Sequence, residues 1–273
     1  MPRRVQTVES LDHPALEPYR TLRCTEEHER RGIFVAEGAK VVERLFASKL
    51  EVLSALLTPE WQHRLLPEGA GFDIYVAPRT VLEQVVGFRL HQGAMAVARV
   101  PAAADWSQVI DEFPSPHLVV ALDGIQLPEN VGTIVRSAAA FGAHAVLHDG
   151  RCASPYQRRA VRSSMGAVFS IPVIAVPDLA PALARLHERR ATRLVVADAH
   201  AEVELPIAQL GGDVAIVLGH EDSGASPGVR ALQVERVAIP MVPGVDSLNV
   251  ASAAAIFLHE ARRNRGKGRE APR

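Results

Sequence analysis

The chain has 273 residues, of which 48% are hydrophobic and 22% are charged, so its composition is that of a folded globular protein and excludes overall disorder. This length exceeds that of a usual single domain, and we expect two domains. The 30 Lys and Arg residues are balanced by 31 Asp and Glu, which excludes a general attraction to phosphate and restricts any nucleic-acid surface to local patches.

The first hundred residues alternate between strand and helix patterns. IFVAEG at 33–38 predicts a strand, and apolar residues recur at helical spacing in the segment AKVVERLFA that follows it. Similar patterns predict further strands at 52–57, 73–77 and 93–100 and helices at 59–66 and 80–86. This alternation predicts a compact α/β domain over residues 1–100.

Residues 101–116 contain three prolines and three consecutive alanines. We interpret them as a linker that carries at most one short helix.

From His117 onward the apolar runs lengthen and stop alternating, which is typical of strands that are covered on both faces in a parallel sheet. These runs are LVVAL, HAVLH, IPVIAV, RLVVAD, VAIVLG and RVAIP. An apolar stripe at helical spacing over 131–142 predicts a helix, with Asn130 as its N-cap. A last helix is predicted after Ser247, and a basic tail follows at 266–273. The pattern predicts a second α/β domain over residues 117–265.

Three polar segments of this second domain follow predicted strands, at 122–142, 216–226 and 239–255. In open α/β sheets the carboxyl ends of the strands are where ligands bind. Each segment taken alone also has a structural interpretation as a capped helix or a tight turn. A dinucleotide site is disfavoured, because the turn after the first strand has glycines only at 124 and 132.

Taken together, the three segments resemble the SpoU family of RNA 2′-O-methyltransferases. That family carries Asn and Arg in its first motif, Gly and Glu in its second, and a Ser-Leu-Asn run in its third. The matching residues here are Asn130, Arg136, Gly219, Glu221, Ser247, Leu248 and Asn249. RSSMGA at 162–167 resembles the Ser-x-Gly-Ala stretch that the family has between its motifs.

The resemblance covers residues 118–261 and extends more loosely to residues 1–100, which resemble the ribosomal-protein-L30e-like RNA-binding domain of many relatives. Two positions depart from the family pattern. Leu127 precedes Pro128 where the family usually has Asp, and His220 follows Gly219 where it often has Asn or Ser.

The resemblance implies an α/β fold in which a small L30e-like domain (1–100) and a linker (101–116) precede a trefoil-knotted, parallel-sheet SPOUT domain (117–265). It implies S-adenosyl-L-methionine as the cofactor, no metal, and a homodimer that acts on RNA, with rRNA favoured over tRNA. The cofactor-binding residues are then Leu218, Gly219, Ile239 and Leu248. Main-chain groups of the last three would recognise adenine, and a glycine at 219 would allow its close approach.

By the same resemblance, Arg136 is the catalytic residue, and Asn130, Glu221, Ser247 and Asn249 complete the polar wall of the site. The pKa of a free arginine lies far above 7, which makes it a poor base at pH 7. Two roles therefore stay open for Arg136: a proton acceptor tuned by a nearby phosphate, or a cation that stabilises the forming alkoxide.

Two local basic patches are present. One lies between the first and second motifs, and we expect its residues Arg158, Arg159 and Arg162 to hold RNA phosphates near the active site. The same stretch also includes Arg151, and the second patch consists of Arg262, Arg263, Arg265, Lys267, Arg269 and Arg273. Both patches also fit a solvated surface and a frayed terminus.

Neither cysteine, Cys24 nor Cys152, has a Cys or His neighbour at metal-ligand spacing. The N-terminal residues do not resemble a signal peptide, and no apolar run approaches the length of a membrane span. We therefore expect a cytoplasmic protein with neither a metal nor a membrane partner.

Two other functions are alternatives to the methyltransferase. A non-catalytic knotted RNA-binding protein that retains cofactor binding is disfavoured because all the polar motif positions are filled. A nucleotide-dependent metabolic enzyme is disfavoured because the glycine fingerprint is missing.

Overall fold

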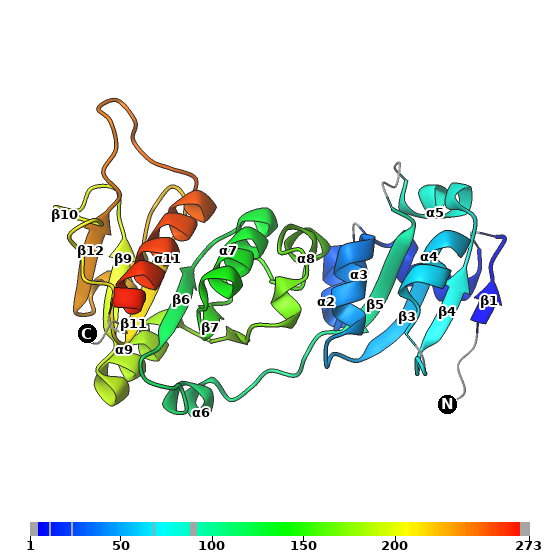
Figure 1. The fold of residues 1–273 in the computed structure, drawn as a ribbon, viewed down its shortest axis with the longest axis horizontal. Helices are drawn as coiled ribbons and strands as arrows, with labels where there is room; N and C mark the ends of the chain where they lie inside the picture. The colour runs from blue at the N-terminus through cyan, green and yellow to red at the C-terminus, as the bar shows by residue number, and fades with distance from the viewer. Residues whose placement is uncertain (1–4, 11, 23, 68, 88–91, 268–273) are drawn as a thin grey trace, which may run out of the picture. The chain divides into compact units, whose positions relative to one another are not determined.

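The computed structural model describes residues 5–10, 12–22, 24–67, 69–87 and 92–267, and it divides the chain into two compact units (Figure 1). The first unit comprises residues 1–102 and 156–170, and the second comprises 103–155 and 171–273. The segment 156–170 lies inside the predicted second domain in sequence but groups with the first unit. Most of the predicted tail, residues 268–273, lies outside the described residues.

The first unit contains a five-stranded mixed sheet in the order β1-β4-β3-β5-β2. Strands β1, β3 and β4 pair in parallel, whereas β5 pairs antiparallel with both β3 and β2. The strands are β1 (Val5–Thr7), β2 (Ile33–Glu37), β3 (Val52–Leu57), β4 (Asp73–Val76) and β5 (Ala94–Arg99). The helices are η1 (Pro14–Leu16), α1 (Glu17–Arg20), α2 (Thr25–Arg30), α3 (Ala39–Phe46), α4 (Pro59–Leu65), α5 (Arg79–Val86), α8 (Arg158–Ser163) and η2 (Ala167–Phe169).

Strand β2 explains why the segment 156–170 packs with the first unit. All five residues of β2 are buried, because helices α2, α3 and α8 pack against it. Phe34 stacks on Phe169 with ring centroids 5.6 Å apart and contacts Tyr156 at 5.3 Å. A fully buried side chain of this size contributes about 1.5–3 kcal/mol to folding. The aromatic cluster therefore holds α8 and η2 on the first unit.

The second unit contains a seven-stranded sheet in the order β10-β12-β9-β11-β6-β7-β8, and every neighbouring pair is parallel. This confirms the predicted parallel sheet. The strands are β6 (Leu118–Asp123), β7 (Ala145–His148), β8 (Val173–Ala175), β9 (Arg193–Ala197), β10 (Val203–Glu204), β11 (Val214–Gly219) and β12 (Val234–Ala238). The helices are α6 (Trp106–Asp111), α7 (Pro128–Phe141), α9 (Leu179–Arg190), α10 (Pro227–Arg230) and α11 (Val250–Lys267).

Helices cover the sheet of the second unit so that its central strands are buried on both faces. All six residues of β6 are buried, which explains its unbroken apolar run. Alternate residues of β6, among them Val119 and Ala121, share a core with α9. Helices α7 and α11 pack side by side (green and red in Figure 1). Among the described residues, no helix is both long and apolar enough to cross a membrane.

The predicted linker is part of the packed core of the second unit. Its one helix, α6, packs against α9, and Ile110 and Phe113 are buried there. The L30e-like character of the first unit and the trefoil knot stay predictions.

The sequence predicts Asn130 as the N-cap of α7, and this prediction is wrong. Leu127 occupies the cap position and Pro128 begins the helix, since the fixed φ of proline suits a first helical turn. Asn130 therefore lies inside the first turn, where it is 7% exposed. Its side chain therefore does not cap the helix and can form hydrogen bonds with other segments of the second unit.

Candidate active site

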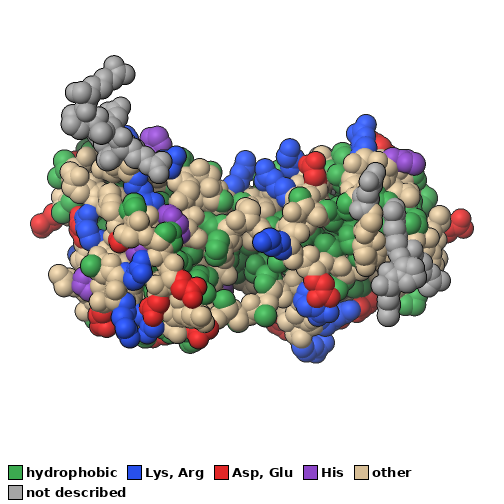
Figure 2. Space-filling view, turned by 60° about the horizontal axis from the view of Figure 1, so that its bottom comes forward, with side chains coloured by type: hydrophobic (Ala, Val, Ile, Leu, Met, Phe, Trp, Pro, Cys, Tyr) green, Lys and Arg blue, Asp and Glu red, His purple; other side chains and the backbone are tan. Residues whose placement is uncertain are grey.

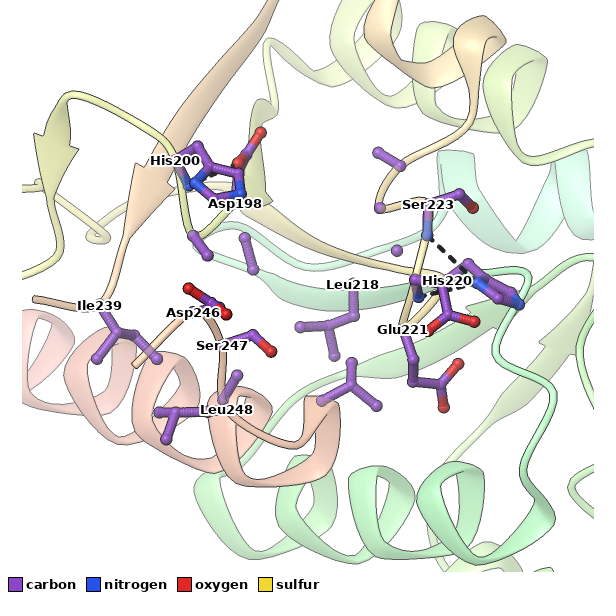
Figure 3. Close-up of a pocket in the computed structure, with 18 of the residues that line it drawn as sticks. Asp198, His200, Leu218, His220, Glu221, Ser223, Ile239, Asp246, Ser247 and Leu248 are labelled. Atoms are coloured by element: carbon purple, nitrogen blue, oxygen red, sulfur yellow. Dashed lines mark hydrogen bonds between the residues drawn. The ribbon is translucent and has the colours of Figure 1, made fainter. Parts of the chain in front are cut away.

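A pocket of about 660 Å³ lies at the carboxyl ends of β9 and β11 in the second unit (Figure 3). Its walls are the turn that follows β11, the residues that follow β9, and the loop between β12 and α11. This volume is in the range of about 300–1,000 Å³ that is usual for small-molecule sites. Parallel strands with adjoining carboxyl ends thus place three sequence-distant loops around one cavity.

Most of the predicted site residues line this pocket. They are Leu218, Gly219, Glu221, Ile239, Ser247, Leu248 and Asn249. Figure 3 shows Leu218 on β11 opposite the loop that carries Ser247 and Leu248. Asn130 and Arg136, both on α7, are not among the lining residues.

The turn after β11 explains why residue 219 is a glycine. A Cβ atom at Gly219 would lie 2.3 Å from the amide nitrogen of Ala225 and the carbonyl carbon of Gly224. The turn closes through two backbone hydrogen bonds between His220 and Gly224, of 2.9 and 3.0 Å. The structure therefore accounts for this glycine by a tight turn, in which the chain folds back on itself.

His220 supports the same turn with its side chain. Its Nδ1 accepts a hydrogen bond from the amide of Asp222 at 3.1 Å, and the amide of Ser223 lies 3.5 Å away (Figure 3). Nδ1 must therefore carry a lone pair here. An Asn or Ser at this position would also offer an oxygen as acceptor, so this departure from the family pattern keeps a hydrogen-bond acceptor.

Hydrogen bonds connect the three motifs at the edge of the pocket. Asn249 Oδ1 accepts the amides of Ala251 and Ser252 in the first turn of α11, at 2.9 and 3.3 Å. This fixes the Asn249 side chain so that its Nδ2 donates to Asn130 Oδ1 at 3.2 Å. Asn130 Nδ2 in turn donates to Glu221 Oε1 at 2.7 Å. The helix start thus determines which way both amides point and where the Glu221 carboxylate is held.

Arg136 does not join the other predicted residues within one chain. It follows Asn130 by six residues on α7, which is about 9 Å along the helix axis. Its side chain is exposed and makes no hydrogen bond or ion pair with any residue that the structure describes. The guanidinium is therefore available to an external anion.

Carboxylates surround part of the pocket, namely Asp198, Glu221, Asp222 and Asp246. Burial acts to raise the pKa of Asp198, but hydrogen bonds from Arg236 Nε at 2.7 Å and the His200 amide at 2.9 Å bring this pKa below its usual value. Apolar side chains of Leu218, Ile239 and Leu248 line the pocket as well. Of the residues that the structure describes, only two arginines, Arg230 and Arg236, line the pocket beside these four carboxylates, so it combines an apolar surface with an excess of acidic side chains.

Several lining residues were not predicted from the sequence, notably Asp198, His200, Arg230, Arg236 and Asp246. Asp198 and His200 follow β9 directly, and the rule that ligands bind at the carboxyl ends of strands could have identified them. Among the described residues, no group of three or more His, Cys, Asp or Glu side chains is arranged to hold a metal ion.

Two basic residues of α8 bind a carboxylate of the first unit, and the expectation that Arg158, Arg159 and Arg162 hold RNA phosphates stays a prediction. Arg158 Nη1 donates to Glu37 Oε2 at 2.5 Å and Arg162 Nη1 donates to Glu37 Oε1 at 3.3 Å, within the first unit. Glu37 is 7% exposed, so these arginines neutralise a buried carboxylate. Basic and acidic side chains are also interspersed over much of the face shown in Figure 2, in keeping with the balanced charge.

Comparison with known proteins connects this site to a family. The model of the SpoU rRNA Methylase family matches residues 117–259. An uncharacterized tRNA/rRNA methyltransferase of Mycobacterium tuberculosis is 34% identical over 95% of this chain and 92% of its own length. A 23S rRNA (uridine(2479)-2′-O)-methyltransferase of Streptomyces viridochromogenes is 33% identical over 78% of this chain and 74% of its own length.

Solved structures lead to the same family. The crystal structure of the SpoU methyltransferase AviRb from Streptomyces viridochromogenes, in complex with the cofactor AdoMet, matches with a TM-score of 0.82 and 28% identity. The match covers 94% of this chain and 100% of that one. With the family model matching more than half of its length, this chain belongs to the SpoU rRNA methylase family.

Proposed function

We propose that this chain transfers a methyl group from S-adenosylmethionine to a ribose 2′-hydroxyl of structured RNA, with rRNA preferred over tRNA. One observation carries the proposal: the second and third motif segments line one pocket, and the hydrogen bonds that link Asn249, Asn130 and Glu221 join the first motif segment to them. The Streptomyces relative named as a 23S rRNA 2′-O-methyltransferase supports the substrate class. We also propose that the protein acts in the cytoplasm, where its RNA substrate is found.

The pocket suits S-adenosylmethionine, which supplies a methyl group already activated by its sulfonium. The volume of about 660 Å³ accommodates a ligand of that size. Leu218, Ile239 and Leu248 offer an apolar surface for the adenine, and main-chain groups of Gly219, Ile239 and Leu248 would recognise its edge. The carboxylates of Glu221 and its neighbours favour a cationic ligand over a neutral one.

The residues of the chain must position the ribose and assist the loss of the proton from its 2′-hydroxyl. Asn130 and Asn249 are held in fixed orientations, so they present a preorganised polar wall. We assign Glu221 and Ser247 to the same wall and Arg136 to the hydroxyl itself. Arg136 either accepts the proton while a phosphate tunes it or stabilises the developing alkoxide as a cation.

We infer that the working form is a homodimer in which one copy contributes Arg136 to the site of the other. Arg136 does not line the pocket of its own chain. Leu127 beside α7 and Ile256 on α11 are large apolar side chains that are 55% and 40% exposed. A symmetric contact between copies would cover such side chains and bring a second α7 close by.

Replacing Arg136 by Ala tests the catalytic assignment. We expect transfer of tritiated methyl groups to total RNA to fall by about 100-fold or more, because a group that stabilises developing charge is lost. Cofactor affinity measured by calorimetry should remain, since Arg136 does not line the pocket. Arg136→Lys should keep part of the rate if the residue acts as a cation.

Arg189→Ala is the matched control, because Arg189 is another exposed arginine of the second unit, on α9. Near-normal transfer by Arg136→Ala would refute the assignment. A wild-type protein that binds the cofactor but methylates no RNA would instead point to the non-catalytic alternative. Mass spectrometry of ribose methylation in RNA from cells with and without the gene would identify the substrate nucleotide.

A further inference from the structure

Asp123 contacts both ends of the turn that carries Glu221. It is the last residue of β6, is 1% exposed, and is the register partner of Gly219 on β11. Its Oδ2 accepts the amide of Ser226 at 2.6 Å. Gly219 and Ser226 are the two ends of the turn over 219–226. The end of β6 therefore holds both ends of this turn, one through the sheet register and the other through a side chain.

Arg151 makes the burial of this carboxylate possible. Its Nη2 donates to Asp123 Oδ1 and also to Asp149 Oδ2. Its Nε donates to Asp149 Oδ2 at 2.9 Å, and its backbone amide donates to Asp149 Oδ1 at 3.0 Å. Two buried carboxylates from the ends of neighbouring strands thus share one guanidinium. Without it, both charges would be buried and would repel each other.

The Arg151 side chain keeps 55% of its surface exposed, so holding it in place costs little desolvation. The Asp123 carboxylate, paired with Arg151, accepts the Ser226 amide in a charge-assisted hydrogen bond, which is stronger than a bond between neutral groups. Neither Asp123 nor Arg151 lines the pocket. Any effect of Arg151 on the ligand must therefore pass through the turn.

We propose that Arg151 and Asp123 are positioning residues for methyl transfer: they hold the turn 219–226 so that Glu221 meets Asn130 and the pocket keeps its shape for the cofactor. This inference rests on the proposed function. It assigns a role in the site to residues that neither bind the ligand nor belong to the polar wall.

A purely structural ion pair supplies the matched comparison. Arg185 on α9 binds Asp111 on α6 through two hydrogen bonds, of 3.1 and 2.5 Å. This pair also joins two elements of the second unit, and neither residue lines the pocket. Loss of either arginine removes a similar contact, but only Arg151 connects to the turn.

The test measures cofactor affinity by calorimetry and thermal stability by scanning calorimetry in Arg151→Ala and Arg185→Ala. We expect both variants to lose stability, and Arg151→Ala alone to bind S-adenosylmethionine more weakly, by roughly tenfold, which corresponds to one charge-assisted hydrogen bond. Equal affinities in the two variants would overturn the proposal. A wild-type protein that does not bind the cofactor would refute the proposed function instead.

A double-mutant cycle gives a second, independent measurement. Asp123→Asn keeps an oxygen that accepts the Ser226 amide but no longer needs a cation, so adding Arg151→Ala to it should weaken cofactor binding less than Arg151→Ala does alone. Additive losses in affinity would contradict the coupling. If Arg151→Ala does not yield folded protein, Arg151→Gln, which removes the charge but keeps a long polar side chain, takes its place in both comparisons.

Discussion

At the residue scale, the structure explains one of the two positions at which the sequence departs from the family pattern. His220 follows the glycine of the second motif, and its Nδ1 accepts the amide of Asp222 inside the turn. Motif comparison can show that the residue differs from Asn or Ser. The structure shows that it retains a side-chain acceptor for an amide within the turn.

Two substitutions at His220 distinguish the role of its hydrogen-bond acceptor from that of its imidazole ring. His220→Asn should keep cofactor affinity within a few-fold of wild type, because a side-chain oxygen can still accept the Asp222 amide. His220→Ala leaves that amide without this partner, and a lost hydrogen bond of about 1 kcal/mol should weaken binding several-fold. Calorimetric titration with S-adenosylmethionine measures both, and equal affinity in His220→Ala and His220→Asn would show that the acceptor is unimportant.

The two cysteines should differ sharply in reactivity. Burial raises the pKa of the Cys152 thiol to about 12, with the nearby Asp149 carboxylate adding to the effect, whereas Cys24 is exposed. The reactive thiolate of Cys152 is therefore scarce at pH 8, and its Sγ is also engaged with the Leu122 carbonyl and the Ile125 amide, both at 3.3 Å. Iodoacetamide labelling followed by mass spectrometry should modify Cys24 first. Comparable rates at the two sites in folded protein would contradict this.

At the element scale, one residue at the N-terminus of α11 both caps the helix and orients a residue of the site. Asn249 caps the helix through its oxygen and orients Asn130 through its nitrogen. From the sequence alone, capping and catalysis are competing explanations for such a residue. The structure shows that they share a side chain, because an amide has an acceptor at one end and a donor at the other.

Two substitutions at Asn249 separate these tasks. Asn249→Ser keeps a good N-cap but removes the Nδ2 amide that donates to Asn130, so we expect stability close to wild type with reduced methyl transfer. Asn249→Ala loses both and should also be destabilised by about 0.5–2 kcal/mol. Scanning calorimetry and the tritium assay check the pair. Full transfer in a stable Asn249→Ser protein would rule out the orienting role.

At the scale of the whole molecule, patterns that are local in sequence predicted much of the fold. The six apolar runs of the second unit became strands β6, β7, β8, β9, β11 and β12. Strands β1 and β10 were not predicted, because they are two or three residues long and are defined by pairing with distant strands. The place of α8 was also unpredictable, because it depends on contacts such as that between Arg158 and Glu37, which lie 121 residues apart.

The candidate site shows the same division. Residues that line the pocket, such as Gly219 and Leu248, were identified from motifs alone. The residues that support them, Asp123 and Arg151, were not identified, because these two residues come together only when neighbouring strands align. Whether Arg136 serves its own pocket or that of a partner likewise depends on how two copies assemble. An experiment on mixed dimers is needed to decide it.

Complementation between two inactive variants decides this point. Arg136→Ala leaves the pocket intact, whereas Gly219→Ala forces a Cβ against the backbone of the turn and should abolish cofactor binding. If Arg136 acts across the dimer, a mixed dimer pairs an intact pocket with the partner's intact arginine. Random mixing makes half of the dimers mixed, each with one working site of two, so transfer should recover to about one quarter of wild type.

If Arg136 instead serves its own pocket, every site in every dimer lacks either the arginine or the cofactor, and mixing recovers nothing. The tritium assay on the subunits mixed after partial denaturation, beside each variant treated alone, gives the answer. A sedimentation mass equal to one chain at micromolar concentration would refute the shared site before any assay, since Arg136 could then reach no pocket but that of its own chain.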